Sequence, residues 1–288
     1  MAVVNTNIGA SLAQASLMKN ERALGTAMEQ LSTGKKINSA GDNAAGLAIS
    51  SRMTSQIRGL DAAIRNANDA ISMVNTAEGA LDEITNMLQR MRELAVQAGT
   101  GTADSADRTY LNSEFAALRT EIDRIVDNTQ WNGRNILDGS AGASTGKSTV
   151  AFQIGQDGVK TQTLSTSFGN FTNDKGKLSG LASKIITGGT VASAITYASS
   201  TITEIDVVIG DVSSQRATFG AISNRLTHAV DNLTNVKTNS EAARSRILDT
   251  DYAAATSELA RTQIIQQAGT AMLAQANQLP QTVLALLQ

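Results

Sequence analysis

The chain has 288 residues, a formal net charge of −2, no cysteine and only 3% aromatic residues. The missing cysteines exclude disulfides and thiolate metal sites, and the near-neutral charge argues against nucleic acid as the main partner. No apolar run reaches the roughly 18–20 residues of a membrane span, so no membrane partner is expected.

The N-terminal segment carries an apolar residue at every seventh position, which predicts a helix with a narrow apolar seam. This row consists of Val3, Ala10, Leu17, Leu24 and Leu31. Ser32-Thr33-Gly34 predicts the end of that helix. A polar linker follows at residues 37–46, in which Asp42 or Asn43 is expected to cap the next helix.

A much longer helix is predicted for residues 44–98. Its seven-residue row consists of Met53, Leu60, Ala67, Val74, Leu81, Leu88 and Ala95. At 1.5 Å per residue this helix would be ~80 Å long, so an elongated molecule is expected. After Gly99-Thr100-Gly101, either Asp104 or Ser105 is expected to cap a third helix.

In the middle of the chain, turn-forming residues and short strand-like runs replace the heptad pattern, which predicts β structure. Two short strands are expected at Thr149–Ile154 and Val159–Leu164, around the turn Gly155–Gly158. Helical periodicity returns from about residue 190, and a polar break is expected at Glu241–Asp251. The last helix carries a seven-residue row of Ile265, Met272, Leu279 and Leu286.

Heptad segments on both sides of a β insertion predict that the two ends pair as antiparallel helices. The expected fold is therefore mainly α, an elongated antiparallel helical hairpin or coiled-coil bundle with a small β-hairpin region. We expect terminal helices at 1–44 plus 245–288 and a long-helix core at 45–138 plus 190–244. Residues 139–189 are expected to form the β-hairpin and a short variable surface region.

Catalytic chemistry is not expected, and no cofactor is implied. His228 is the sole histidine, which excludes any two-histidine metal motif and favours an ordinary exposed helix residue. Residues 142–148 resemble a phosphate-binding loop, but the spacing is one residue short and a strand follows where a helix is needed. A flexible turn is the simpler interpretation.

The terminal helices bury little apolar area as a lone pair, whereas ordering them costs ~1–2 kcal/mol per residue for the backbone. We therefore hypothesise that the ends order when neighbouring subunits supply the missing burial, which a gain of helical circular dichroism on assembly would test. The residues expected to drive this polymerisation are Leu17, Leu24, Leu31, Ile265, Met272, Leu279 and Leu286.

Several motifs along the chain resemble those of one known family. Residues 31–49, LSTGKKINSA followed by DNAAGLAI, resemble the N-terminal signature of the bacterial flagellins. Residues 89–97, QRMRELAVQ, resemble their long-helix motif, and residues 131–137, WNGRNIL, resemble the turn into their β region. Residues 267–281 resemble their C-terminus. The resemblance covers about residues 1–138 and 190–288, and it implies a short form without large outer domains.

The resemblance implies a structural subunit that polymerises into the flagellar filament, with the terminal helices lining an inner tube and the long helices forming an outer tube. It implies export in unfolded form through the flagellar type III system to an extracellular filament. The implied partners are further copies of the chain, an export chaperone for the C-terminal segment, the filament cap and hook-associated proteins. The alternatives are a hook–filament junction protein and an enzyme carried on a helical scaffold.

The same resemblance implies recognition by an innate immune Toll-like receptor. The residues that match the family's recognition surface are Leu88, Gln89, Arg90, Glu93, Leu94, Gln97 and Glu114. The plainer interpretation is that this surface contacts the next subunit in the filament. We expect one surface to serve both roles, with the structural role primary.

Overall fold

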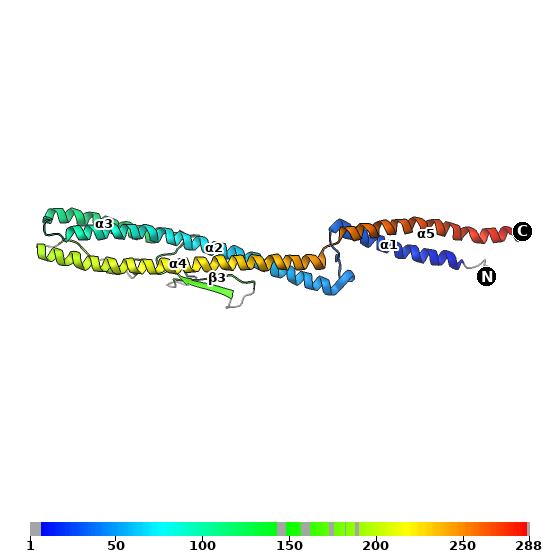
Figure 1. The fold of residues 1–288 in the computed structure, drawn as a ribbon, viewed down its shortest axis with the longest axis horizontal. Coiled ribbons are helices and arrows are strands. Elements are labelled where there is room, and N and C mark those ends of the chain that lie inside the picture. The colour runs from blue at the N-terminus through cyan, green and yellow to red at the C-terminus, as the bar shows by residue number, and fades with distance from the viewer. Residues whose placement is uncertain are drawn as a thin grey trace. The chain divides into compact units, whose positions relative to one another are not determined.

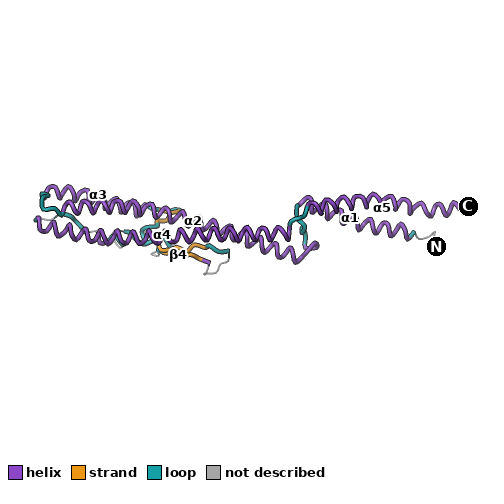
Figure 2. Tube along the Cα trace, viewed as in Figure 1, coloured by secondary structure: helices purple, strands orange, loops and turns teal. Residues whose placement is uncertain are grey.

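The computed structural model describes residues 7–142, 148–156, 162–172, 176–181, 183–187 and 190–286, with side chains described as far as residue 278. The helices are α1 (Ile8–Thr33), α2 (Ala40–Ala98), α3 (Ser105–Asn128), α4 (Val191–Leu248) and α5 (Tyr252–Leu286) (Figure 1). The strands are β1 (Gln130–Trp131), β2 (Arg134–Asn135), β3 (Thr149–Gln153) and β4 (Thr163–Ser167). The fold is mainly α with small antiparallel strand pairs, which confirms the predicted fold class (Figure 2).

The chain forms two compact units. The terminal unit comprises residues 1–57 and 238–288, and the central unit comprises residues 58–237. Helices α2 and α4 each contribute residues to both units. The β region at residues 139–189 belongs to the central unit.

Polar side chains mark the helix starts, as the sequence predicted. Within α2, Asn43 has non-helical dihedral angles (φ −165°, ψ 96°), and its Oδ1 accepts a hydrogen bond from Gly46 N at 2.8 Å. The uninterrupted part of α2 therefore begins after this cap. Helix α3 begins with a capping box. The Asp104 side chain accepts from the backbone N–H of Asp107, and the Asp107 side chain accepts from the backbone N–H of Asp104.

The predicted break across Glu241–Asp251 was too wide. Helix α4 continues to Leu248, because polar residues on an exposed helix face do not by themselves end a helix. The break is confined to the residues just before α5, where Asp251 Oδ1 accepts from Ala253 N at 2.9 Å. A capping aspartate, rather than overall polarity, sets this boundary.

The predicted β-hairpin is present, with a displaced second strand. Strands β3 and β4 pair antiparallel from Thr149↔Ser167 to Gln153↔Thr163. The expected second strand began at Val159, whereas residues 157–161 lie outside the described part of the chain and β4 starts at Thr163. Packing explains the displacement, because Leu164 and Thr166 alternate inward and are both buried.

The core of the central unit draws on α2, α3, α4 and the segment after β3. Its largest buried side chains include Phe115, Phe168, Phe171 and Phe219, all at most 1% exposed. The rings of Phe168 and Phe219 lie 5.2 Å apart at 50°. Despite the low aromatic content of the sequence, this unit therefore concentrates aromatic rings in one closed core.

Ion pairs show that α2 and α4 run antiparallel in the central unit. From one ion pair to the next, the α2 residue lies later in the sequence and the α4 residue lies earlier by the same number of residues. The pairs are Asp61–Lys237 (2.7 Å), Asp82–Arg216 (3.0 Å) and Arg92–Asp206 (2.7 Å). Because these groups are partly exposed, they define the register more than they stabilise the fold.

In the terminal unit, α1 packs against α5, and Figure 1 shows the two helices side by side. The linkers on either side of this pair bond to each other. Lys36 N donates to Leu248 O at 2.7 Å, and Thr250 N donates to Gly34 O at 3.0 Å. Gly34 ends α1 in the left-handed conformation (φ 70°), as its place in Ser32-Thr33-Gly34 predicted.

Candidate assembly surfaces

The seam of α1 against α5 follows the predicted heptads on the α1 side. Leu17, Leu24 and Leu31 are partly buried, and Asn20 and Ala27 between them are buried. Three- and four-residue steps between these positions are the spacing of a coiled-coil seam. The three leucines therefore hold α1 on α5, while Val3 lies outside the described residues.

The seam on the α5 side uses residues that the sequence analysis did not select. Apart from Glu258, which bonds to Arg261, the buried and partly buried positions are Ala255, Leu259, Thr262, Gln266, Gly269, Leu273 and Ala276. They too alternate steps of four and three, but most are small or polar, so a search for apolar rows misses them. The seven-residue spacing of small residues, from Ala255 to Ala276, is the sequence pattern that could have indicated this seam.

The close approach of the helices explains this composition. A methyl group added at Gly269 would lie only 3.0 Å from Cδ1 of Leu17. Asn7 Nδ2 donates to Ala276 O at 2.8 Å, which places the start of α1 beside the later part of α5. Small side chains on α5 therefore let the two backbones approach each other.

Large apolar side chains of both helices point away from the seam. The exposed set comprises Ile8, Leu12, Met18 and Met28 of α1, and Ile264, Ile265 and Met272 of α5. We call these residues the outer apolar set. Ile265 and Met272 come from the row expected to drive polymerisation, and they are 42% and 65% exposed. The side chains of Leu279 and Leu286, from the same row, lie outside the described part of the chain.

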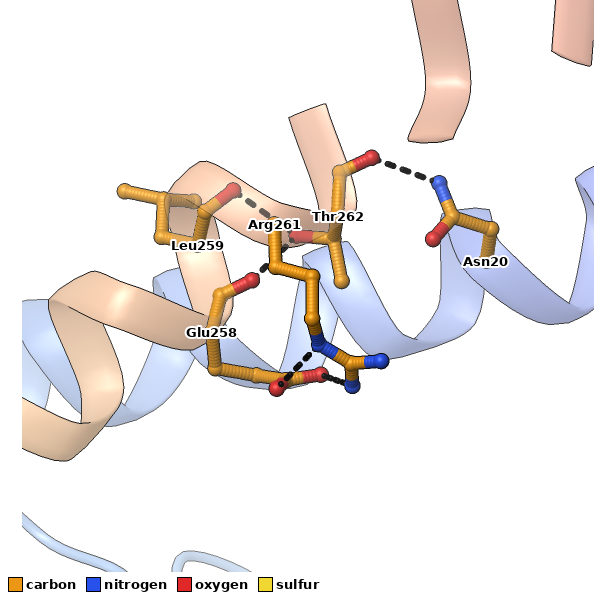
Figure 3. A network of polar contacts seen from close by, with 5 residues as sticks. All are labelled: Asn20, Glu258, Leu259, Arg261 and Thr262. Atoms are coloured by element: carbon orange, nitrogen blue, oxygen red, sulfur yellow. Dashed lines mark hydrogen bonds and ion pairs between the residues drawn. The ribbon is translucent and has the colours of Figure 1, made fainter. Parts of the chain in front are cut away.

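A polar layer crosses the middle of the seam (Figure 3). Asn20 Nδ2 donates to Thr262 O at 2.7 Å, and both residues are buried. The Thr262 hydroxyl bonds back to Glu258 O and Leu259 O of its own helix, both at 2.9 Å. Nearby, hydrogen bonds from Arg261 to Glu258 raise the pKa of Arg261. The layer is thus satisfied within the chain.

A second exposed surface lies on α2 and α3 in the central unit. Arg90 Nε and one terminal nitrogen lie 2.9 Å from Glu114 Oε1, and its other terminal nitrogen lies 3.0 Å from Glu93 Oε2. Hydrogen bonds to Glu114, then to Glu93, raise the pKa of Arg90. Gln89 and Gln97 are exposed on the same helix. Together these five residues form what we call the α2–α3 surface.

The two leucines predicted for this surface are fully buried. Leu88 and Leu94 belong to the core of the central unit, at 0% exposure. They hold α2 in place beneath the exposed side chains. A shallow hollow of about 480 Å³ lies beside the surface, lined by Gln89, Arg92, Glu93, Val96 and Gln97.

His228 is the one histidine that the sequence offers for catalysis or metal binding. His228 is exposed on α4. Among the described residues, no group of His, Cys, Asp and Glu side chains is placed to hold a metal ion. The helices that the structure describes include none long and apolar enough to cross a membrane. The paired α1 and α5, the exposed outer apolar set and the charged α2–α3 surface are features of a structural subunit that packs against other chains.

Comparison with known families agrees with that class. Residues 4–142 match the bacterial flagellin N-terminal helical region, and residues 202–287 match the bacterial flagellin C-terminal helical region. These segments cover more than half of the chain. The chain belongs to the bacterial flagellin family and is a structural subunit of the flagellar filament.

Individual relatives extend over nearly the whole chain. The flagellin of Halalkalibacterium halodurans is 44% identical, with 99% of this chain and 100% of the relative covered. Flagellin A of Vibrio cholerae is 37% identical, with 99% of each chain covered. That second alignment spans 375 positions and so contains segments without a counterpart here, consistent with a short form.

A solved structure supports the fold alone. It is described as a putative flagellar hook-associated protein from Vibrio parahaemolyticus, and it matches with a TM-score of 0.60 at 14% identity. The match covers 72% of this chain and 100% of that one. At this identity, the likeness concerns the arrangement of helices and carries no functional assignment.

Proposed function

We propose that the chain polymerises through the outer apolar set of its terminal unit, which packs against further copies of the same chain. The carrying observation is that the fully buried positions between α1 and α5 are small or polar, whereas large apolar side chains of both helices are exposed. Ile8, Leu12, Ile264 and Met272 are each at least 65% exposed. Membership of a filament-forming family favours a second copy as the occupant.

In this proposal the expected polymerisation residues have two tasks. Leu17, Leu24 and Leu31 hold α1 on α5 within the subunit. Ile265 and Met272 face neighbouring subunits, and Leu279 and Leu286 continue their seven-residue row. Burial of each such side chain supplies about 1.5–3 kcal/mol, so a few per subunit suffice to drive association.

The proposed division of labour assigns the inner tube to the terminal helices, at 1–44 plus 245–288. The long helices, at 45–138 plus 190–244, form the outer tube, and residues 139–189 lie on the filament surface. The two compact units support the separation of ends from middle, with the division in the structure at 57/58 and 237/238. Hydrogen exchange before and after assembly would test it, since inner-tube amides should gain the most protection.

The α2–α3 surface is the second proposed contact. Arg90, Glu93 and Glu114 offer charged hydrogen-bonding groups beside a hollow, and such groups suit specific recognition by another protein. We propose that it contacts a neighbouring subunit and is recognised by the innate Toll-like receptor. Loss of receptor signalling in Arg90→Ala, with the fold intact, would support this, and unchanged signalling would count against it.

The delivery route is also part of the proposal. A flagellar filament subunit must reach the outside of the cell. We therefore propose export through the flagellar type III system, with an export chaperone, a filament cap and hook-associated proteins as partners, and family membership supports this proposal. Detection of the full-length chain outside the cell only in strains with an intact export system would support this route. Export from strains without it would contradict it.

The assembly proposal is tested by placing charge in the outer apolar set. Ile264→Asp with Met272→Asp should raise the monomer concentration needed to elongate seeds by about tenfold per residue, because each lost burial is worth at least ~1.4 kcal/mol. Electron microscopy of seeded monomer gives the readout, and long tubes from the unaltered chain would also argue against a junction protein.

Met272→Leu and Ile264→Val provide the matched controls, since both keep an apolar side chain and should elongate normally. Unfolding of the central unit should be unchanged in all variants. Elongation by the aspartate variant at the unaltered concentration would refute the proposed role of the outer apolar set.

A further inference from the structure

The pairing of α1 with α5 presents a problem of partner choice. The α1 seam combines leucines with Asn20 and Ala27, the α5 seam is mostly small or polar, and the outer apolar set lies elsewhere on both helices. Apolar burial is non-directional, so it does not distinguish the α5 seam from the large apolar side chains of α5 or of another copy. In a filament those alternatives are present at high local concentration. Something in α1 must favour the α5 seam.

Asn20 is the buried polar side chain of the α1 seam. It is 8% exposed and lies between Leu17 and Leu24, where an apolar residue would continue the heptad. Its amide nitrogen bonds to Thr262 O at 2.7 Å (Figure 3). A buried amide without a partner is strongly unfavourable, so Asn20 restricts α1 to partners that present a reachable acceptor.

The α5 seam presents such acceptors because its side chains leave the backbone accessible. The Thr262 side chain is turned back onto its own helix through bonds to Glu258 O and Leu259 O. Two heptads later, Ala276 O accepts from Asn7 at 2.8 Å, and Gly269 lies between them on the same face. The side chains of Ile264, Ile265 and Met272 are apolar and offer an amide no strong acceptor.

We infer that Asn20, assisted by Asn7, is the residue that selects the α5 seam as the partner of α1 and rejects the outer apolar set. A polar residue at one seam position is a known means of fixing partner and register at some cost in stability. Docking of the α1 seam on large apolar side chains buries Asn20 without an acceptor. This inference rests on the proposed function, because rejection matters where subunits crowd together.

The test replaces Asn20→Leu and reads the pairing by cross-linking. The chain has no cysteine, so an introduced pair reports one contact. Leu17→Cys with Gly269→Cys reports the seam, since a methyl group at position 269 would lie 3.0 Å from Cδ1 of Leu17. Leu17→Cys with Met272→Cys reports docking on the outer apolar set. A short bifunctional maleimide is applied to seeded assemblies and to monomer.

With Asn20 present, the 17–269 pair should give the dominant cross-link within one chain. In Asn20→Leu, the ratio of 17–269 to 17–272 product should fall at least fivefold, and cross-links between chains should increase. Circular dichroism should show no loss of helix, because leucine is a good helix former. An unchanged ratio in Asn20→Leu would overturn the inference, as would failure of the 17–269 pair to react with Asn20 present.

Gln14→Leu is the matched control. Gln14 is exposed on the same helix, so this variant adds the same apolar group outside the seam. The ratio of 17–269 to 17–272 product in Gln14→Leu should match that of the unaltered chain. A fall equal to that of Asn20→Leu would show that added apolar surface anywhere on α1 causes the change. Failure of the unaltered chain to elongate seeds would refute the proposed function instead, and the cross-link ratio in monomer would still decide the role of Asn20.

Discussion

The central and terminal units are both helical, but they bury different kinds of residue. The central unit encloses Phe115, Phe168, Phe171 and Phe219 in its core. Between α1 and α5, the buried side chains are small or polar, such as Ala27 and Thr262. The central unit thus buries four phenylalanine rings within the chain, whereas the terminal unit leaves its largest apolar side chains exposed. In the proposed function, the terminal unit supplies the outer apolar set for assembly and the central unit supplies the α2–α3 surface.

The largest effect is expected from Phe219→Ala, which tests whether the central unit has a closed core. Phe219 is fully buried against Phe168, so its removal leaves a cavity and should lower the free energy of unfolding by about 3–5 kcal/mol. Chemical denaturation of the monomer provides the measurement. Below the new unfolding midpoint, pairing of α1 with α5 should persist. A loss below about 1 kcal/mol would mean that the central core is not closed.

A smaller effect is expected from Gly269→Leu in the terminal unit. The added side chain meets Leu17 at a distance where even a methyl group is crowded, so overpacking should cost about 1–3 kcal/mol of α1–α5 pairing. Seeded elongation should weaken, while the denaturation midpoint of the central unit stays the same. Ala268→Leu, at an exposed neighbouring position, is the control. Normal pairing in Gly269→Leu would show that the seam is loose.

The smallest effect concerns the linker before α2. Asp42 Oδ2 accepts from Ser39 N at 2.8 Å and Asn38 N at 3.0 Å, and these backbone hydrogen bonds lower the pKa of Asp42. A lowered pKa in the folded state stabilises the linker above the unfolded carboxyl's pKa, about 4, and this contribution is lost as pH falls through the folded value. Protection of the Asn38 and Ser39 amides should therefore decrease below pH ~4.

Exchange rates corrected for the intrinsic effect of pH give that measurement. Asp42→Asn supplies the comparison, since its protection should be weak and independent of pH in the same range. Equal pH dependence in both chains would mean that Asp42 does not hold the linker. The amides of the central core should remain protected throughout, which would sharpen the contrast between the two units.

Sequence alone determined the elements and the family. Heptad rows located the long helices, and the caps at Asn43 and Asp104 followed from short polar side chains that bond to free backbone amides. The motifs near residues 31–49 and 89–97 indicated flagellin. These features are local, because helix periodicity and capping are decided within a few turns of the chain.

Tertiary structure decided which face of α5 lies inside, whereas the predicted rows of α1 and α2 do lie inside. The row of Ile265 and Met272 has the strongest apolar pattern in α5, yet it is exposed, and the seam runs through Thr262 and Gly269. Leu88 lies in the core, as its place in the seven-residue row of α2 predicted, and not on the surface that the family resemblance implied. Periodicity identifies which residues share a face, but burial depends on what packs there. In α5 the close approach of α1 and the bond from Asn20 decide that, and neither can be read from one helix.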